Sequence, residues 1–257
     1  MSANNPVDGQ HRAAILREMG LAPLWKLRAA TAPETMPETQ PQAAPVQRVA
    51  QPDMIEVSAT GSERTAAIAA MDWPALRVSV AECRACTLCQ QRKQAVPGVG
   101  DQSADWLFVG EGPGAEEDER GEPFVGQAGK LLDAMLAAIG LKRGQDVYIA
   151  NAVKCRPPGN RTPAAEEMAA CRPYLERQIE LLQPKLIVAL GRPAAQTLLQ
   201  TEVKISAMRG RLCKYNDIPL IITYHPAYLL RTLSDKAKAW EDLCLARRTM
   251  KKIKLDL

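Results

Sequence analysis

Four short apolar runs stand out in the second half of the chain and predict the strands of a sheet. They are WLFVG (106–110), DVYIAN (146–151), KLIVALG (185–191) and IPLIITY (218–224). The runs are rich in β-branched residues and do not alternate with polar ones, which is typical of parallel strands covered on both faces. We therefore expect a mainly parallel four-stranded sheet.

Helical periodicity fills the intervals between these runs. Over 128–139 apolar residues recur with i, i+3, i+4, i+7 spacing and end at Gly140, a suitable C′ residue. Thr162 and Pro163 are predicted to be the N-cap and first residue of a later helix, which Pro173 is expected to bend or restart. Strands alternating with helices predict an α/β fold, a three-layer sandwich whose site lies at the carboxyl ends of the strands.

The first 70 residues differ from the rest of the chain in composition and in hydrophobic pattern. Residues 1–28 contain a short helical pattern, over 11–28, which either docks onto a partner protein or folds back onto the chain. Residues 29–70 are predicted to be a disordered linker because closely spaced prolines exclude helix and sheet. These prolines are Pro33, Pro37, Pro41, Pro45 and Pro52. The functional domain is then expected over 71–257.

Composition narrows the class of protein. The 257 residues are 46% hydrophobic, enough for one sizeable core. No run approaches the roughly 18 apolar residues of a membrane span, and no signal pattern opens the chain, so we expect a cytoplasmic protein. The net charge of +4 permits a polyanionic partner without requiring one. Seven cysteines, an odd number, argue against a disulfide framework.

Four of the cysteines form two pairs with the spacing of metal ligands. Cys83 and Cys86 form a C-x2-C pair, and Cys155 and Cys171 lie at a strand end and on the next helix. Four thiolates from two separated pairs can surround a zinc ion or hold an iron-sulfur cluster. Cys171 alone would be read as a small buried hydrophobe, but the two pairs together favour shared ligation.

Three cysteines lie outside these pairs. Cys89 extends the first pair to C-x2-C-x2-C, a run that also begins ferredoxin-type motifs, so the spacing alone leaves its role open. Cys213 and Cys244 have no close partners in the sequence. We expect them to be ordinary core residues.

A glycine-rich segment, GEGPGAEEDERGEPFVGQAGKLL (110–132), directly follows the first predicted strand. Gly110, Gly112 and Ala115 match a dinucleotide-binding pattern, but that pattern needs a helix to open at once, whereas an acidic run and a second turn follow. The glycines can still let backbone N–H groups approach a ligand. Phe124, in this polar loop, either contacts a ligand or fills the core.

The segment TYHPAYLLR (223–231) follows the last predicted strand. His225 is the only histidine outside the N-terminal segment, and it lies where α/β folds collect catalytic groups. The residues after it predict a loop that contacts a large ligand.

These motifs, in this order, match a known family. GEGPG with EPFVGQAG, NAVKCRPPGNR, HPAYLLR and the two cysteine pairs closely resemble the family-four uracil-DNA glycosylases, which carry an iron-sulfur cluster. The resemblance covers residues 72–257. It implies a uracil-DNA glycosylase-like sandwich and a DNA repair enzyme, a hydrolase that flips uracil out of DNA and cleaves its N-glycosidic bond to leave an abasic site.

The resemblance also implies a cofactor and its ligands. A 4Fe-4S cluster would be held by the residues that match the family's ligands, Cys83, Cys86, Cys155 and Cys171. Cys89 would then be a non-ligand. Cys155 would tether the loop after Asn151 to the cluster.

Roles in uracil recognition follow by the same resemblance. Phe124 would stack on the flipped base, and the Asn151 amide would match the O4 and N3–H edge of uracil. A neutral His225, with backbone N–H groups of the Glu111-Gly112 turn, would hydrogen-bond O2 and stabilise the charge on the departing base. The role of Glu111 stays open, because it can orient either the attacking water or the loop.

DNA contacts and partners complete these expectations. Leu229, Leu230 or Arg231 would enter the duplex at the vacated position. The partner would be uracil-containing DNA, single- or double-stranded, bound by a monomer in the bacterial or archaeal nucleoid. Two alternatives remain: a non-catalytic iron-sulfur or zinc module that binds nucleic acid, and a nucleotide-binding enzyme that uses the glycine-rich loop.

Overall fold

The computed structural model describes residues 58–256, and its centre is a six-stranded sheet in the order β1-β3-β2-β4-β6-β5. The four predicted strands are present and mutually parallel, as β2 (Trp106–Gly110), β3 (Val147–Asn151), β4 (Leu186–Leu190) and β6 (Ile218–Thr223). The described part of the chain contains no helix long and apolar enough to cross a membrane.

Two antiparallel edge strands extend the predicted sheet. β1 (Val99–Gly100) pairs with β3, and β5 (Leu212–Tyr215) pairs with β6. The prediction of four strands was therefore incomplete at both edges. β1 has only two residues, and β5 alternates between exposed and half-buried positions, so neither shows the continuous apolar run of a central strand.

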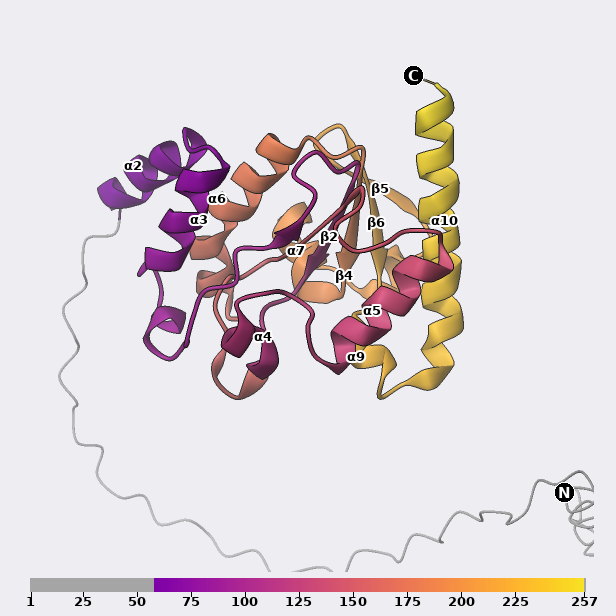
Figure 1. Cartoon of the computed structure of the whole chain (residues 1–257), viewed down its shortest axis with the longest axis horizontal. Helices are drawn as coiled ribbons and strands as arrows, with labels where there is room; N and C mark the ends of the chain where they lie inside the picture. The colour runs from indigo at the N-terminus through magenta and orange to yellow at the C-terminus, as the bar shows by residue number, and fades with distance from the viewer. Residues whose placement is uncertain (1–57, 257) are drawn as a thin grey trace, which may run out of the picture. The chain divides into compact units, whose positions relative to one another are not determined.

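Helices cover both faces of the sheet, which confirms the three-layer sandwich (Figure 1). On one face α6 (Ala165–Leu182) and α7 (Arg192–Leu199) pack against strand residues such as Leu107 and Ile187. On the other face α5 (Gln127–Ala138) and α10 (Lys236–Leu255) pack against the alternate residues, such as Phe108 and Val188. Successive strand residues thus enter opposite cores, which explains why the runs do not alternate.

Two further helices and several short ones complete the domain. α2 (Ser58–Ala69) and α3 (Trp73–Glu82) form a third apolar cluster with α6. The short elements are α4 (Ala115–Arg120), α8 (Ile205–Met208), α9 (Pro226–Leu229) and the 3-10 turns η1 (Thr87–Gln90), η2 (Pro158–Asn160) and η3 (Leu233–Asp235). Most of these short elements lie in loops at the carboxyl ends of the parallel strands.

Helix α6 differs from its prediction at two points. Its N-cap is Ala164 rather than Thr162, because the side chain of Glu167 folds back and accepts a hydrogen bond from the Ala164 N–H at 2.8 Å. Pro173 lies inside the helix without ending it. Buried residues on both sides of the proline, Cys171 and Tyr174 among them, hold the helix against the core.

The predicted linker over 29–70 extends too far at its C-terminal end. Residues 58–69 form α2, whose Ile68 is buried and whose Arg64 donates a hydrogen bond to the Ala170 carbonyl of α6 at 3.0 Å. Burial of one apolar position and this tertiary contact stabilise a helix that the composition did not suggest. The helix predicted over 11–28, and the rest of the linker, lie outside the described residues.

Candidate active site and cysteine chamber

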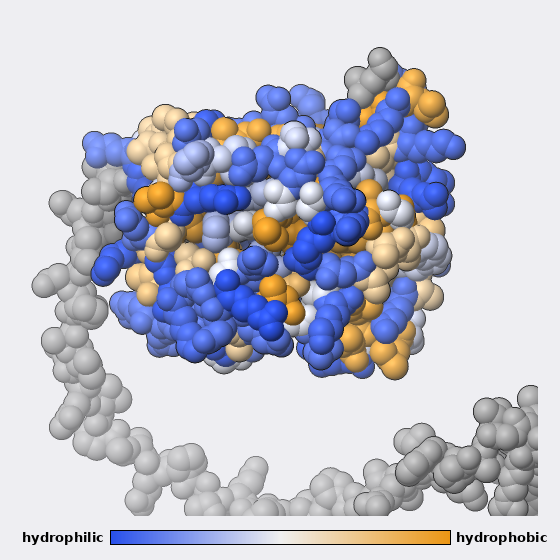
Figure 2. All heavy atoms as spheres, in the orientation of Figure 1, coloured by the Kyte–Doolittle hydropathy of each residue, from blue (hydrophilic) through white to orange (hydrophobic). Residues whose placement is uncertain are grey.

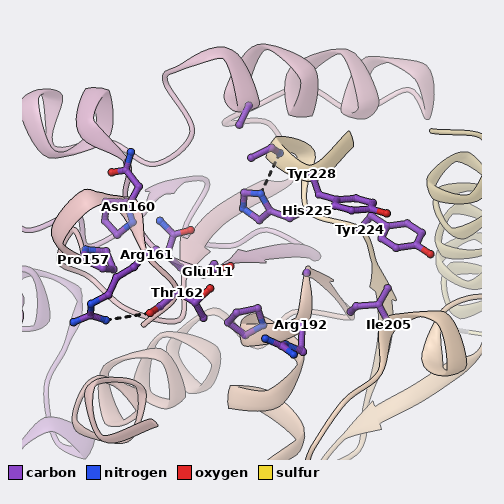
Figure 3. A pocket seen from close by; sticks show the side chains of 18 of the residues that line it. Glu111, Pro157, Asn160, Arg161, Thr162, Arg192, Ile205, Tyr224, His225 and Tyr228 are labelled. Carbon is purple, nitrogen blue, oxygen red and sulfur yellow. Dashed lines mark hydrogen bonds between the residues drawn. The ribbon is translucent and has the colours of Figure 1, made fainter. Parts of the chain in front are cut away.

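A cleft of about 910 Å³ opens at the carboxyl ends of the parallel strands. Its walls are the loops that follow β2, β3, β4 and β6, four segments that are far apart in the sequence. In Figure 3, Tyr224 and Tyr228 lie on one side of His225, and Glu111 and Thr162 lie on the other. The site therefore lies where the sequence predicted it.

Gly110 brings two predicted uracil contacts together. A Cβ at this position would lie 2.4 Å from Oδ1 of Asn151 and 2.5 Å from Cζ of Phe124. The absence of a side chain at Gly110 thus lets both groups reach the floor of the cleft. The acidic run that follows forms α4, a helix that the sequence analysis missed.

Phe124 is 6% exposed and lines the cleft. Its ring centroid lies 5.4 Å from that of His225, with 29° between the planes. The backbone is left-handed, with φ of 56°, and the Phe124 carbonyl accepts a hydrogen bond from Arg143 at 2.8 Å. Gly129 of α5 permits this turn, because a Cβ there would come 1.8 Å from the Phe124 oxygen. Phe124 is therefore held in place by its backbone.

Glu117 joins the two halves of the glycine-rich segment. Its Oε1 accepts hydrogen bonds from the N–H groups of Val125 at 2.9 Å and Gly126 at 3.0 Å, and its Oε2 accepts from Gly114 at 3.1 Å. The carboxylate is buried. The sequence analysis did not identify this residue, although its place three residues after Gly114 is the spacing of a capping box.

Asn151 ends β3 beside Gly110 of β2 and is 2% exposed. Its Oδ1 is buried, and the described part of the chain gives it no hydrogen-bond partner. Buried polar atoms are nearly always paired in folded proteins, so an unpaired one that lines a cleft indicates a ligand contact. Asn151 thus lines the cleft at the end of β3.

His225 presents one nitrogen to the cleft. Its Nδ1 accepts a hydrogen bond from the Ala227 N–H at 3.1 Å, so the proton of the neutral ring lies on Nε2. Burial, together with the charge of Arg231, lowers the pKa of His225 to about 4. Its Nε2 is buried and has no hydrogen-bond partner among residues 58–256. At neutral pH the ring is therefore uncharged and lines the cleft with an available Nε2–H donor.

Glu111 lines the cleft next to these groups (Figure 3). Burial raises the pKa of its carboxyl, while a hydrogen bond with Thr162 and the charge of Arg192 oppose that shift. Its carbonyl accepts a hydrogen bond from the Val153 N–H at 3.1 Å, which ties the loop after β2 to the loop after β3. A carboxylate at this place can orient a water molecule or the loop itself.

The three predicted DNA-wedge residues have different positions. Leu229 is 1% exposed and packs inside the domain, so the expectation that it enters DNA is wrong. Leu230 is 42% exposed, and Arg231 is exposed and lines the cleft. Leu233, two residues further, is 64% exposed. Figure 2 shows a mostly hydrophilic face with apolar side chains at its lower right edge, near α5 and α9 of Figure 1.

Five cysteines line a second, smaller cavity, here called the cysteine chamber: Cys83, Cys86, Cys89, Cys155 and Cys171. They come from the segment around η1, the loop after β3 and helix α6, so the structure brings together the four predicted ligands. Cys89 lies beside them. Cys213 and Cys244 lie elsewhere, on β5 and α10, and are half-buried.

Nitrogen donors surround the sulfurs of the chamber. Arg92 lies 2.9 Å from Sγ of Cys155, Arg64 lies 3.7 Å from Sγ of Cys83, and the Lys154 N–H lies 3.3 Å from Sγ of Cys171. Guanidinium and N–H groups stabilise thiolates, so this donor set fits a group bound by negatively charged sulfur. Within residues 58–256, no three or more His, Cys, Asp or Glu side chains are arranged so that they could hold a metal ion.

Comparisons with known proteins agree on one family. A model of the uracil DNA glycosylase superfamily matches residues 97–244. The type-4 uracil-DNA glycosylase of Archaeoglobus fulgidus is 48% identical over 159 residues, which cover 59% of this chain and 79% of that protein. The enzyme of the same type from Pyrobaculum aerophilum is 44% identical over 184 residues, 68% of this chain and 93% of the relative.

A bacterial relative shows the same likeness. The type-4 uracil-DNA glycosylase of Thermotoga maritima is 45% identical over 177 residues, 67% of this chain and 92% of that protein. The superfamily match over residues 97–244 spans the sheet and the loops that line the cleft. This chain belongs to the type-4 family of the uracil-DNA glycosylase superfamily.

Proposed function

We propose that this chain flips uracil out of DNA and hydrolyses its N-glycosidic bond, leaving the abasic site at which base excision repair begins. The observation that carries this conclusion is the pair of buried, unpaired polar atoms in one cleft, Oδ1 of Asn151 and Nε2 of His225. Together they offer an acceptor and a donor to a base that is absent from the free protein.

Asn151 selects uracil by its hydrogen-bonding edge. Its Oδ1 accepts the N3–H of uracil, and its Nδ2 donates to O4. Cytosine carries an acceptor at N3 and a donor at N4, so it would leave buried groups unpaired at roughly 1 to 3 kcal/mol each. Phe124 stacks on the face of the flipped base, as its fixed place in the cleft suggests.

His225 assists the departure of the base. When the C1′–N1 bond breaks, its electron pair leaves with the base, and negative charge spreads to O2. Nε2–H of His225 and backbone N–H groups of the Glu111-Gly112 turn donate hydrogen bonds to this oxygen. A neutral imidazole suits the task because its pKa lies near 4, well below neutral pH.

Glu111 orients the water that completes the hydrolysis. The water oxygen forms the new bond to C1′, and its proton passes to the carboxylate or to solvent. Support for this role comes from the position of Glu111 in the cleft beside Thr162 and Arg192. Gly112, on the same turn, offers its backbone to the base without a side chain in the way.

Leu230 and Arg231 contact the DNA around the flipped nucleotide. Leu230 is the exposed leucine next to the cleft and fills the vacated position in the base stack, while Arg231 binds a flanking phosphate. The protein acts as a monomer on single- or double-stranded DNA.

We further propose that Cys83, Cys86, Cys155 and Cys171 hold a 4Fe-4S cluster and that Cys89 does not. When bound, such a cluster would supply a rigid tie between the segments that bear these cysteines. The donors around the sulfurs support this assignment. The protein purified without air should then be yellow-brown with about four irons per chain, because each cluster corner is one iron. A colourless protein with one zinc would overturn it.

The proposed activity is tested with two oligonucleotides that differ only by uracil or thymine at one position. Alkali cleaves DNA at abasic sites, so strand scission of the uracil oligonucleotide alone is the expected result. Salt-sensitive binding to both oligonucleotides without scission would instead favour the non-catalytic nucleic-acid module.

A further inference from the structure

Lys154 lies between the cleft and the cysteine chamber. It is 1% exposed, although lysine is among the residues least often buried. Its Nζ donates to the Asn151 carbonyl at 2.8 Å and to Oε1 of Gln178 at 2.6 Å. One buried ammonium group therefore holds the main chain of the residue that contacts uracil.

The charge of Lys154 has no carboxylate partner among residues 58–256. Both of its hydrogen-bond acceptors are neutral oxygens. Burial lowers the pKa of Lys154 to about 8. A buried ammonium group is costly unless its hydrogen bonds are satisfied, so the two bonds to Asn151 and Gln178 fix it in place.

The main chain of the same segment joins the two sites. The Lys154 N–H contacts Sγ of Cys171 at 3.3 Å, and its carbonyl accepts a hydrogen bond from the Val96 N–H at 2.7 Å. Three residues separate Asn151 from Cys155, and all five residues of 151–155 are buried. The Ala152 N–H donates to the Gly110 carbonyl at 2.9 Å, so a shift here would also reach the loop after β2.

We propose that Lys154 is a positioning residue whose ammonium fixes the main chain of Asn151 and whose own main chain is held against Cys171 of the cysteine chamber. The chamber is thereby coupled to base recognition. This inference rests on the proposed function, because it assumes that Asn151 reads uracil and that the cysteines bind an anionic cluster.

The test compares Lys154→Met with a matched control, Lys251→Met, which removes a lysine from the exposed surface of α10. Lys154→Met keeps the length of the side chain and removes its charge and donors. Single-turnover release of uracil should fall by roughly 10- to 100-fold, as when an outer-shell partner is lost. Binding of DNA with a stable abasic analogue should change less than threefold, because that DNA has no base to read. Lys251→Met should match the unaltered protein.

A second measurement does not depend on activity. Removing a positive charge beside a cluster makes the gain of an electron less favourable, so its reduction potential should become more negative in Lys154→Met and stay constant in Lys251→Met. Uracil release within twofold of the unaltered protein, or an unchanged potential, would overturn the proposal.

If Lys154→Met loses its iron or fails to fold, Gln178→Leu tests the proposed role of Lys154 instead. This variant removes the second acceptor of the ammonium and leaves 151–155 intact, so uracil release should still fall at least threefold, and unchanged release would overturn the coupling. Failure of the proposed function would look different: the unaltered protein itself would leave uracil in DNA or contain no iron.

Discussion

The cleft and the cysteine chamber differ in whether their buried polar atoms have hydrogen-bond partners. In the cleft, Oδ1 of Asn151 and Nε2 of His225 are buried and find no hydrogen-bond partner in the structure described for 58–256. In the chamber, the sulfurs of Cys83, Cys155 and Cys171 each have a nitrogen donor within 3.7 Å. A third unpaired atom among the described residues, Nε of Arg172, still lies 3.3 Å from a Glu176 carboxylate oxygen.

This difference supports the proposal that the cleft reads a transient ligand and the chamber holds a resident group. Unpaired atoms have a free-energy penalty until the ligand supplies their partners, so they create selectivity. Donors already directed at sulfur favour a bound group whose sulfur ligands carry negative charge. Changes in the cleft should therefore alter rate and selectivity, whereas changes in the chamber should alter retention of iron and stability.

The largest effect is expected for His225→Ala. It removes the donor that matters most when charge develops on O2, so single-turnover release of uracil should fall by about 10²- to 10³-fold. Binding of uracil-DNA should change much less, because the neutral base gains little from this bond. Rate and binding are measured at one salt concentration. Near-unaltered release would leave His225 a structural residue of its loop.

The next effect is expected for Asn151→Asp. A carboxylate opposite uracil O4 replaces a donor with an acceptor, which should reduce the preference for uracil over cytosine by roughly 1 to 3 kcal/mol. Release of each base from the same sequence context gives this ratio. Asn216→Asp, on the exposed β5–β6 turn, adds the same charge away from the cleft and serves as the control. An unchanged ratio would remove Asn151 from the recognition edge.

Phe124→Ala should weaken both binding and release. Loss of a stacking platform costs about 1 to 3 kcal/mol per base, with little dependence on charge. Titration with uracil-DNA and with abasic DNA separates stacking from backbone contacts, since only the first should weaken. Equal weakening for the two DNAs would mean that Phe124 supports the fold of the cleft instead.

A smaller effect is expected in the pH dependence of stability. The pKa of His225 is about 4 in the folded protein and near 6.5 for an unperturbed histidine. The unfolded chain therefore binds the proton first as pH falls, and this contribution to the free energy of unfolding decreases between about pH 6.5 and 4. Denaturant unfolding across this range should show less loss in His225→Gln. Identical pH profiles would contradict the depressed pKa.

The smallest effect is expected for Cys89→Ser. If this cysteine only lines the chamber, the iron content and visible absorbance of the variant should equal those of the unaltered protein. Cys171→Ser is the matched comparison and should lose iron. Loss of iron in Cys89→Ser would make that residue a ligand.

The central strands and the motifs could be predicted from the sequence because their signals are local. The runs around Phe108 and Val188 are buried on both faces, so their apolar character is continuous. Asn151, Cys155 and His225 immediately follow such runs or lie a few residues beyond them. The carboxyl ends of parallel strands meet at one edge, so the topology brings Asn151 and His225 to one cleft, while Cys155 lines the cysteine chamber.

Other features depend on contacts between distant segments and have no local signal. Helix α2 is stabilised by α6 through Arg64, more than a hundred residues away from its acceptor. In the sequence Glu117 is one of several acidic residues in a row, and only the structure shows that its carboxylate accepts hydrogen bonds from the N–H groups of residues 125 and 126. The burial of Lys154 and of Leu229 is likewise a property of packing, because neither residue type reveals it.

The central claim is that His225 is uncharged in the free protein and donates a hydrogen bond from Nε2–H to the base when the base enters the cleft. Nitrogen-15 NMR of the imidazole at neutral pH, before and after addition of free uracil, tests it most directly. The account predicts a neutral ring protonated on Nε2, whose Nε2–H resonance shifts when uracil binds while Nδ1 remains an acceptor. A charged ring, a proton on Nδ1, or an Nε2–H signal that ignores saturating uracil would contradict it.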